Sequence, residues 1–148
     1  MNITASAQVR AATSKDFAAV VELLQSGNLP VEDISTKLPD FFVIEDGGEV
    51  VAAIGLEPYG EHGLLRSMVV DPEYRNKSLA AVLLKRLLLH AIEQRITRLY
   101  LITTTAEKYF SKKGFVVLDR ERVPASIAAS REFSMLCPST ATVMIKEL

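Results

Sequence analysis

Apolar residues recur at helical spacing in two stretches of the chain. In the longer stretch they return every three or four positions, the spacing of one buried helix face; they are Ala80, Leu83, Leu84, Leu87, Leu88 and Ala91. In the shorter stretch they are Phe17, Val20, Val21 and Leu24. Thr13 and Asp16 precede the shorter stretch with the spacing of a capping box, and Gly27 follows it. The pattern predicts one helix that closes at Gly27 and another that begins near Leu79.

Short apolar runs bounded by turn residues predict strands between and after these helices. Residues 41–57 contain two such runs on either side of Asp46-Gly47-Gly48, a sequence typical of a hairpin turn. The other expected strands are 8–13, 63–70, 98–104, 115–118 and 140–148. The other expected helices are 31–38, 106–114 and 124–136. Because no internal repeat or linker interrupts this alternation, residues 1–148 are expected to form one α/β domain of mixed topology.

Composition narrows the classes of function. Of the 148 residues, 49% are hydrophobic and 24% charged, a balance typical of a globular domain. The net charge is −1 and no basic block occurs, which argues against a nucleic-acid partner. Cys137 is the single cysteine, so neither an internal disulfide nor a metal site is expected. No signal-peptide pattern and no apolar run of about 18 residues are present, which predicts a cytoplasmic protein without a membrane partner.

The segment from Leu64 to Leu89 combines a buried strand, a polar turn and the longer helix. The first N–H groups of a helix lack intrahelical partners and lie at the positive end of its dipole, so they favour anions. Arg75 and Lys77 add positive charge beside them. Taken alone, however, this turn favours a plain strand-to-helix connection with a solvated basic edge.

The surrounding residues change that interpretation. The stretch "MVVDPEYRNKSLAAVLL" resembles the cofactor motif of the GNAT superfamily of acyl-CoA-dependent N-acyltransferases, and "AEKYFSKKGF" resembles its second signature. The segment "LITTTAEKYF" is also similar to the acetyltransferase domain of N-acetylglutamate synthases. Three longer stretches, "GLEPYGEHGLLRSMVV", "YLITTTAEKYFSKKGF" and "VPASIAASREFSMLCPSTATVM", look like a small branch described as arsenic-resistance-associated.

The resemblance implies a GNAT fold, with a mixed, mostly antiparallel central sheet that splays near Met68–Val70 and about four flanking helices. It implies acetyl-CoA as cosubstrate, with the pantetheine arm paired to the backbone of Met68, Val69 and Val70. The backbone N–H groups implied for the pyrophosphate are those of Arg75, Asn76, Lys77, Ser78, Leu79 and Ala80. Thr103 stands where many members carry a CoA-contacting asparagine.

Three residues depart from the family pattern. Ala80 stands at the second glycine of the turn, where alanine is a common variant. Ser78 replaces the first glycine of the turn; a negative φ there costs little, whereas a positive φ costs about 1 kcal/mol or somewhat more. Phe110 stands in the cofactor region where many members carry the tyrosine that protonates the CoA thiolate. Tyr109 is adjacent but rotated by about 100° on a helix, so it is either a catalytic substitute or a packing residue.

Three further residues are candidates for binding or activating the acceptor. Glu57 is the candidate base for the attacking amine, with a strand-end surface residue as the alternative. Arg66 lies in an apolar strand, where its planar fork suits either a carboxylate of the acceptor or an internal ion pair, Glu57 included. Ser67 points to the opposite face of a regular strand, so it joins this site only if a bulge intervenes.

These residues together predict a cytoplasmic N-acetyltransferase that moves an acetyl group directly to a small amine in a ternary complex. The expected acceptor is an amino acid or an amino-acid-like compound. The alternative from another class is a non-catalytic acyl-CoA-binding or regulatory module, which Ser78 and Phe110 motivate. Protein acetylation is disfavoured, and a homodimer stays open.

Overall fold

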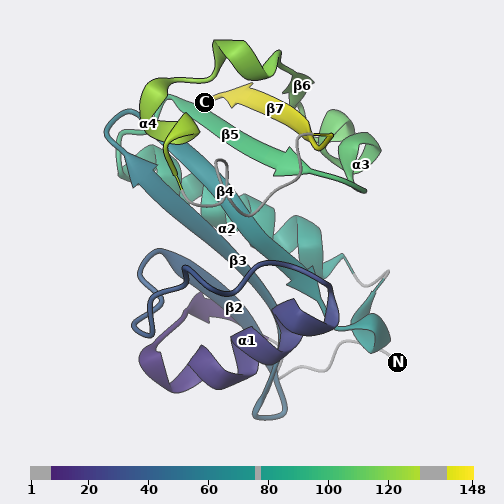
Figure 1. Ribbon diagram of the computed structural model, residues 1–148. Helices are drawn as coiled ribbons and strands as arrows, with labels where there is room; N and C mark the ends of the chain where they lie inside the picture. Colours follow the sequence, from purple (N-terminus) through teal and green to yellow (C-terminus); the bar gives the residue numbers. More distant parts are fainter. Residues whose placement is uncertain (1–7, 76–77, 131–139) are drawn as a thin grey trace. The chain divides into compact units, whose positions relative to one another are not determined.

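The computed structural model describes residues 8–75, 78–130 and 140–148 (Figure 1). Its strands are β1 (Gln8–Ala11), β2 (Phe41–Asp46), β3 (Glu49–Tyr59), β4 (His62–Val70), β5 (Arg98–Thr103), β6 (Val116–Val117) and β7 (Thr142–Glu147). Its α-helices are α1 (Phe17–Ser26), α2 (Leu79–Glu93), α3 (Glu107–Lys112) and α4 (Ala125–Ala128). Short 3₁₀ turns are η1 (Ser14–Asp16), η2 (Pro72–Tyr74) and η3 (Arg120–Arg122).

The strands follow the order β1-β2-β3-β4-β5-β7-β6, and all the registers recorded between neighbours are antiparallel except that of β4 and β5. The expected fold class, a mixed and mostly antiparallel sheet with about four helices, is therefore confirmed. The chain divides into two compact units: a first unit, Met1–Leu56 with Ser67–His90, and a second unit, Glu57–Arg66 with Ala91–Leu148. A single domain over residues 1–148 stays a prediction.

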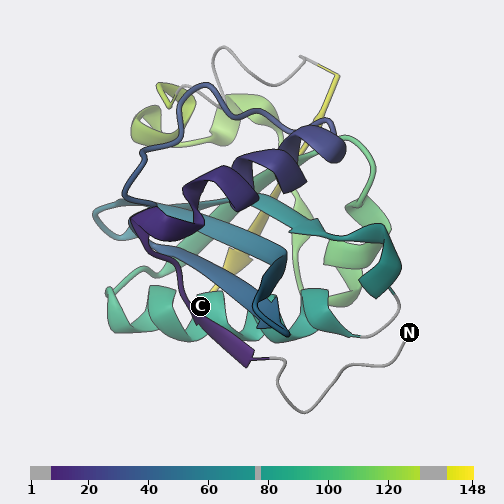
Figure 2. The ribbon, with the colours of Figure 1, turned by 90° about the horizontal axis from the view of Figure 1, so that it is seen from below.

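In the first unit, α1 and α2 cover opposite faces of the strands (Figure 2). Alternation along β2 explains this arrangement, because successive side chains of a strand point to opposite faces. Val43 packs in a buried cluster with Val20, Leu23 and Leu24 of α1. On the other face, the Phe42 ring lies 4.4 Å from the guanidinium carbon of Arg86 and 5.1 Å from the ring of His90, both on α2.

The predicted hairpin lies between β2 and β3 and is confirmed. Gly47 and Gly48 have φ values of 60° and 86°, the left-handed backbone that a two-residue hairpin loop requires. The turn leaves Asp46 buried at the end of β2, only 6% exposed. A carboxylate so placed needs a hydrogen-bond partner.

The second unit is built on β5, the central strand of this part. The paired positions of β4 and β5 run from His62 and Arg98 to Leu64 and Tyr100, whereas β4 continues to Val70. On its other side β5 pairs with β7 over its full length. The buried cluster of this unit is Leu64, Tyr100, Ile127 and Val143.

The helix predicted over residues 31–38 is wrong, because the structure has turns between α1 and β2. Hydrogen bonds from Ile34 N–H to the Val31 carbonyl and from Leu38 N–H to the Ser35 carbonyl close two separate turns. Leu38 has φ of 48°, which ends any right-handed helix, and the proline at position 39 disfavours helical backbone at the residue before it. The helix predicted over 124–136 is shorter than expected: α4 spans Ala125–Ala128, and 131–136 lie outside the described residues.

Within the described ranges, none of the helices has both the length and the apolar character to cross a membrane.

The start of α1 is held by a charged cluster around Asp16, which is 6% exposed. Thr13 N–H donates to Asp16 Oδ2 at 2.8 Å, as the predicted capping box requires. Arg10 donates through both terminal nitrogens to the two Asp16 oxygens, each at 2.8 Å, and also to Glu45 Oε1 at 2.8 Å. The hydrogen bond from Arg10 is the largest cause that lowers the pKa of Asp16 below its ordinary value.

We therefore expect Asp16→Asn to lower the free energy of unfolding at pH 7 by about 1–2 kcal/mol, discounted because the Arg10 side chain is more than a third exposed. Since the folded-state pKa of Asp16 lies below its unfolded value, its contribution is present above pH ~4 and is lost as the pH falls through the folded pKa. Urea unfolding at pH 7 and pH 3 measures this, with exposed Glu22→Gln of α1 as control. A difference from wild type that does not shrink at pH 3 contradicts the prediction.

Candidate functional site

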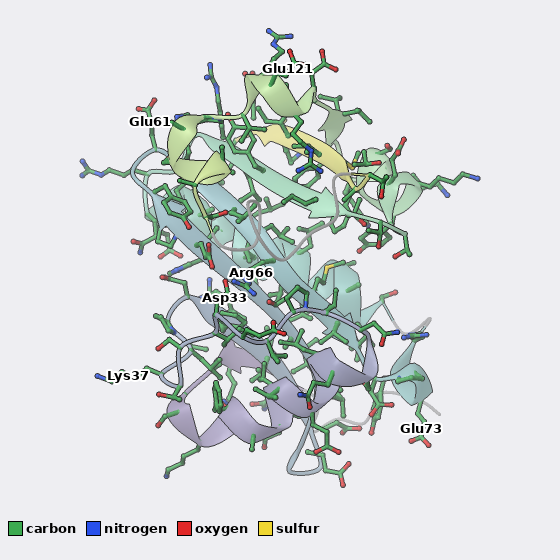
Figure 3. The ribbon with its side chains drawn as sticks, in the orientation of Figure 1. Asp33, Lys37, Glu61, Arg66, Glu73 and Glu121 are labelled. Carbon is green, nitrogen blue, oxygen red and sulfur yellow. The ribbon has the colours of Figure 1, made fainter. Side chains whose placement is uncertain are left out.

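The turn after β4 is shaped by local hydrogen bonds in the first unit. Asp71 N–H donates to the Val51 carbonyl of β3 at 2.8 Å. The Asp71 carboxylate accepts from Glu73 N–H at 2.9 Å and so caps η2. Tyr74 N–H then returns to the Asp71 carbonyl at 2.8 Å. Glu73 points away from the ribbon (Figure 3), whereas Tyr74 is only 8% exposed. The turn is therefore anchored to the sheet on one side and open to solvent on the other.

The entry to α2 is a left-handed residue, because Ser78 has φ of 63°. Its carbonyl accepts the hydrogen bond from Val82 N–H at 3.2 Å, which begins the helix. The N–H groups of Leu79, Ala80 and Ala81 consequently have no acceptor within the helix. These groups, at the positive end of a helix of 15 residues, fit an anion such as a phosphate.

The φ of Ser78 decides between the two costs given above for a serine at this position. Ser78 occupies the backbone region that glycine adopts freely, and a side chain there costs about 1 kcal/mol or somewhat more. Its side chain is exposed, so the hydroxyl is accessible to a ligand. Asn76 and Lys77, also expected at this turn, lie outside the described residues.

The positive φ of Ser78 predicts that Ser78→Gly raises the free energy of unfolding by about 1 kcal/mol, because strain is relieved without loss of a buried contact. Cofactor affinity should rise or stay level. Ser78→Ala keeps the strain and removes only the hydroxyl, so it separates the two effects. Urea unfolding of the three proteins measures the free energy of unfolding, and calorimetric titration with acetyl-CoA measures the affinity. A large loss of affinity in both variants would mean that the hydroxyl itself binds phosphate.

The strand that leads into this turn is irregular at Ser67, which has φ of 59° and is 6% exposed. Such a value does not occur in a regular strand, so the simple alternation of faces fails at this residue. The backbone is therefore irregular at the residue for which a bulge was required, and the place of Ser67 in the acceptor site stays a prediction. Beyond it Val69 is buried and Met68 and Val70 are half-buried. Their proposed backbone contacts to pantetheine stay a prediction.

In the second unit, the Glu57 carboxylate accepts hydrogen bonds at both oxygens. Arg66 Nη1 donates to Oε2 at 2.7 Å, and Tyr59 Oη donates to Oε1 at 2.7 Å. The Arg66 side chain, which comes from β4 (Figure 3), is 1% exposed, and that of Glu57 is 26% exposed. The ion pair with Glu57, one of the two alternatives for Arg66, is thus realised. Direct binding of an acceptor carboxylate by Arg66 stays a prediction.

Sequence reasoning missed Tyr59. Its pKa is raised above the ordinary value of a tyrosine, first by burial and then by the hydrogen bond to Glu57, while a hydrogen bond with the Ser130 side chain lowers it. The phenol therefore stays a neutral donor at physiological pH. The signal was available, because residues two apart on a strand share a face and Tyr59 follows Glu57 at that spacing.

The remaining candidates are Thr103, which precedes α3, and Tyr109 and Phe110, which lie in it. Thr103 Oγ1 accepts from Ala106 N–H at 2.9 Å and from Thr105 N–H at 3.3 Å, and so closes the turn between β5 and α3. Phe110 is 4% exposed and packs edge-on against Phe115 at 5.4 Å. The Tyr109 hydroxyl is buried and has no hydrogen-bond partner among the described residues, and burial raises its pKa. Tyr109 therefore keeps its proton more firmly than a free tyrosine.

In this mixed α/β protein the fourth strand of the sheet leads through a short turn to a helix start whose free N–H groups suit a phosphorylated ligand. Residues 11–115, well over half of the chain, match the acetyltransferase (GNAT) family. The chain belongs to that family. The narrower resemblance to arsenic-resistance-associated members stays a prediction.

Similar proteins agree with this assignment. The amino-acid acetyltransferase of Escherichia coli K12 is 29% identical over 128 residues, which cover 80% of this chain and 29% of that protein. N-acetylglutamate synthase from Neisseria gonorrhoeae, solved with coenzyme A and N-acetyl-glutamate, aligns with a TM-score of 0.83 at 18% identity over 98% of this chain and 36% of that one. Rv2747 from Mycobacterium tuberculosis, solved with coenzyme A, aligns at 0.80 with 23% identity over 95% and 99% of the two chains. The chain spans less than a third of the E. coli relative, and the structural likeness supports the fold.

Proposed function

We propose that this protein is an acetyl-CoA-dependent N-acetyltransferase whose acceptor is the amine of a small carboxylate-bearing molecule, such as an amino acid. The observation that carries the proposal is the start of α2 directly behind Ser78 in a GNAT chain, where the first N–H groups have no acceptor within the helix. The amino-acid acetyltransferases among its relatives favour the acceptor class. Coenzyme A in the two solved neighbours favours the cosubstrate.

In this proposal the pyrophosphate is held by the N–H groups of residues 79–81 and by the positive charge of Arg75. The backbone of residues 68–70 binds the pantetheine arm and polarises the thioester carbonyl, as oxyanion-type donors do. The acceptor nitrogen forms a bond to the acetyl carbon while the carbon–sulfur bond breaks, and the electron pair leaves with the thiolate. A thiol with a pKa near 8.5 leaves readily as its anion, so no strong acid is required at Phe110.

The proton of the attacking amine goes to Glu57 in the proposed reaction. Arg66 and Tyr59 orient this carboxylate, since each donates to one of its oxygens. A hydroxyl hydrogen can rotate about its C–O bond, so Tyr59 can turn its hydrogen away from Glu57 and leave Oε1 open. Glu57 is then the catalytic base and Tyr59 a positioning residue. Tyr109 is the remaining candidate to return a proton to the thiolate.

The second candidate function is a non-catalytic acyl-CoA-binding module. The phenyl ring at position 110 supports it, because that side chain has no proton to give, and burial makes Tyr109 a weaker acid than a free tyrosine.

We expect the purified protein to release CoA from acetyl-CoA when it is supplied with the right member of a panel of amino acids and simple amines. Release of the free thiol, followed with a thiol reagent, measures the reaction. Glu57→Gln should lower kcat/KM by roughly 10²-fold or more, the usual contribution of a positioned base. Tight binding of acetyl-CoA without turnover on any acceptor would favour the binding module. Absence of acetyl-CoA binding would remove both candidates.

The two roles left open for Arg66 predict different kinetics. If its buried guanidinium only holds Glu57, Arg66→Ala lowers kcat and shifts the pH profile toward that of Glu57→Gln, with the acceptor KM unchanged. If it also contacts an acceptor carboxylate, the acceptor KM rises as well. The 1% exposure of the side chain favours the first outcome. Amino acids and the corresponding amines without a carboxylate, compared on both proteins, separate the two roles.

A further inference from the structure

Asp46 and Tyr74 form a buried hydrogen bond that neither the fold nor the family assignment uses. Tyr74 Oη donates to Asp46 Oδ2 at 2.8 Å, across 28 positions of sequence. Asp46 is 6% exposed and Tyr74 is 8% exposed. The hydrogen bond to Asp46 is the largest cause that raises the pKa of Tyr74 to about 12, with burial second and the charges of Glu49 and Asp71 contributing less. The phenol is therefore a neutral donor at any physiological pH.

In the first unit, this pair joins the end of β2 to the end of the η2 turn. Asp46 ends β2 at the hairpin turn, where Gly47 and Gly48 adopt the left-handed backbone of a two-residue loop. Tyr74 ends η2, and only residues 75–77 separate it from the left-handed Ser78 at the entry to α2. The hydrogen bonds inside the turn, among Asp71, Glu73 and Tyr74, set its shape. They do not attach the Tyr74 end of the turn to the sheet, whereas the bond to Asp46 does.

We propose that Asp46 is a positioning residue for the cofactor turn: through Tyr74 it places the backbone N–H groups that receive the pyrophosphate. A carboxylate near an anion site repels the ligand, so its charge is a disadvantage there and its value lies in the oxygen that accepts from Tyr74. The inference rests on the proposed function, because it assigns a task within acetyl-CoA binding. It adds a residue that comes from β2, outside the turn and its signature.

A comparison of two thioester substrates separates this positioning role from a general effect on stability. Acetyl-CoA carries the pyrophosphate, whereas S-acetylpantetheine has the same thioester and pantetheine arm without it. Tyr74→Phe keeps the ring and removes only the hydroxyl. We expect it to raise the KM for acetyl-CoA roughly three- to tenfold and to leave the KM for S-acetylpantetheine unchanged. Asp46→Ala should have the same effect, and the double variant should be no worse than the poorer single one.

Asp46→Asn tests the conservative replacement, because its amide oxygen still accepts from Tyr74 while the charge is removed. Its KM for acetyl-CoA should stay within about twofold of wild type or fall below it. Tyr100→Phe is the matched control: Tyr100 is also a buried tyrosine, 3% exposed, but it lies on β5 in the second unit. It should leave the ratio of the two KM values unchanged even if it lowers the melting temperature.

Equal changes for both ligands, or none, in folded Tyr74→Phe would overturn the inference. If that variant does not fold, Asp46→Asn against Asp46→Ala decides it, since a positioning role requires only the second to lose acetyl-CoA affinity selectively. Failure of the wild-type protein to bind acetyl-CoA would instead refute the proposed function, and the two failures are distinguishable.

Discussion

The helix α2 can present its first N–H groups to an anion because the start of a helix leaves them without intrahelical acceptors, and the chain enters this start through a left-handed residue. Ser78 sets this entry with φ of 63°, and the bond from Val82 to its carbonyl starts the helix directly behind it. Other parts of the first unit fix where this entry lies. The strand β4 and the η2 turn precede Ser78 in the chain, and the buried face of α2 packs the helix against the sheet. The backbone strain at one exposed residue is small beside this apolar burial, which explains how a serine is tolerated where glycine is the unstrained choice.

Periodicity was sufficient for the elements whose pattern is local. The spacing of Leu83, Leu84 and Leu87 predicted α2, and Asp46-Gly47-Gly48 predicted the hairpin. It failed for residues 31–38, where Leu38 has φ of 48° and the proline that follows disfavours helical backbone at this residue. The φ of Ser78 was undecidable from the sequence, because a cost of about 1 kcal/mol for positive φ is small enough for the strand and helix on its two sides to override it.

The sequence was sufficient to select the residues of the candidate site, but it did not show which of them form hydrogen bonds with one another. Glu57 and Arg66 were both expected, yet their sequence allows a substrate contact or an ion pair, and only packing decides that Arg66 is enclosed. Tyr59 follows from strand alternation and was overlooked, since a tyrosine at a strand end has many uses. The bond between Asp46 and Tyr74 joins residues 28 positions apart, and no local pattern reports such a contact.

Thr103 shows how one side chain can combine two tasks that differ in the direction of hydrogen bonding. A hydroxyl has two lone pairs and one hydrogen. The lone pairs of Thr103 are engaged, because the N–H groups of Thr105 and Ala106 both donate to its oxygen. Its hydrogen takes no part in these two bonds. The residue that ends β5 therefore remains a donor, and an acceptor atom can use this hydrogen without disturbing the turn that leads to α3.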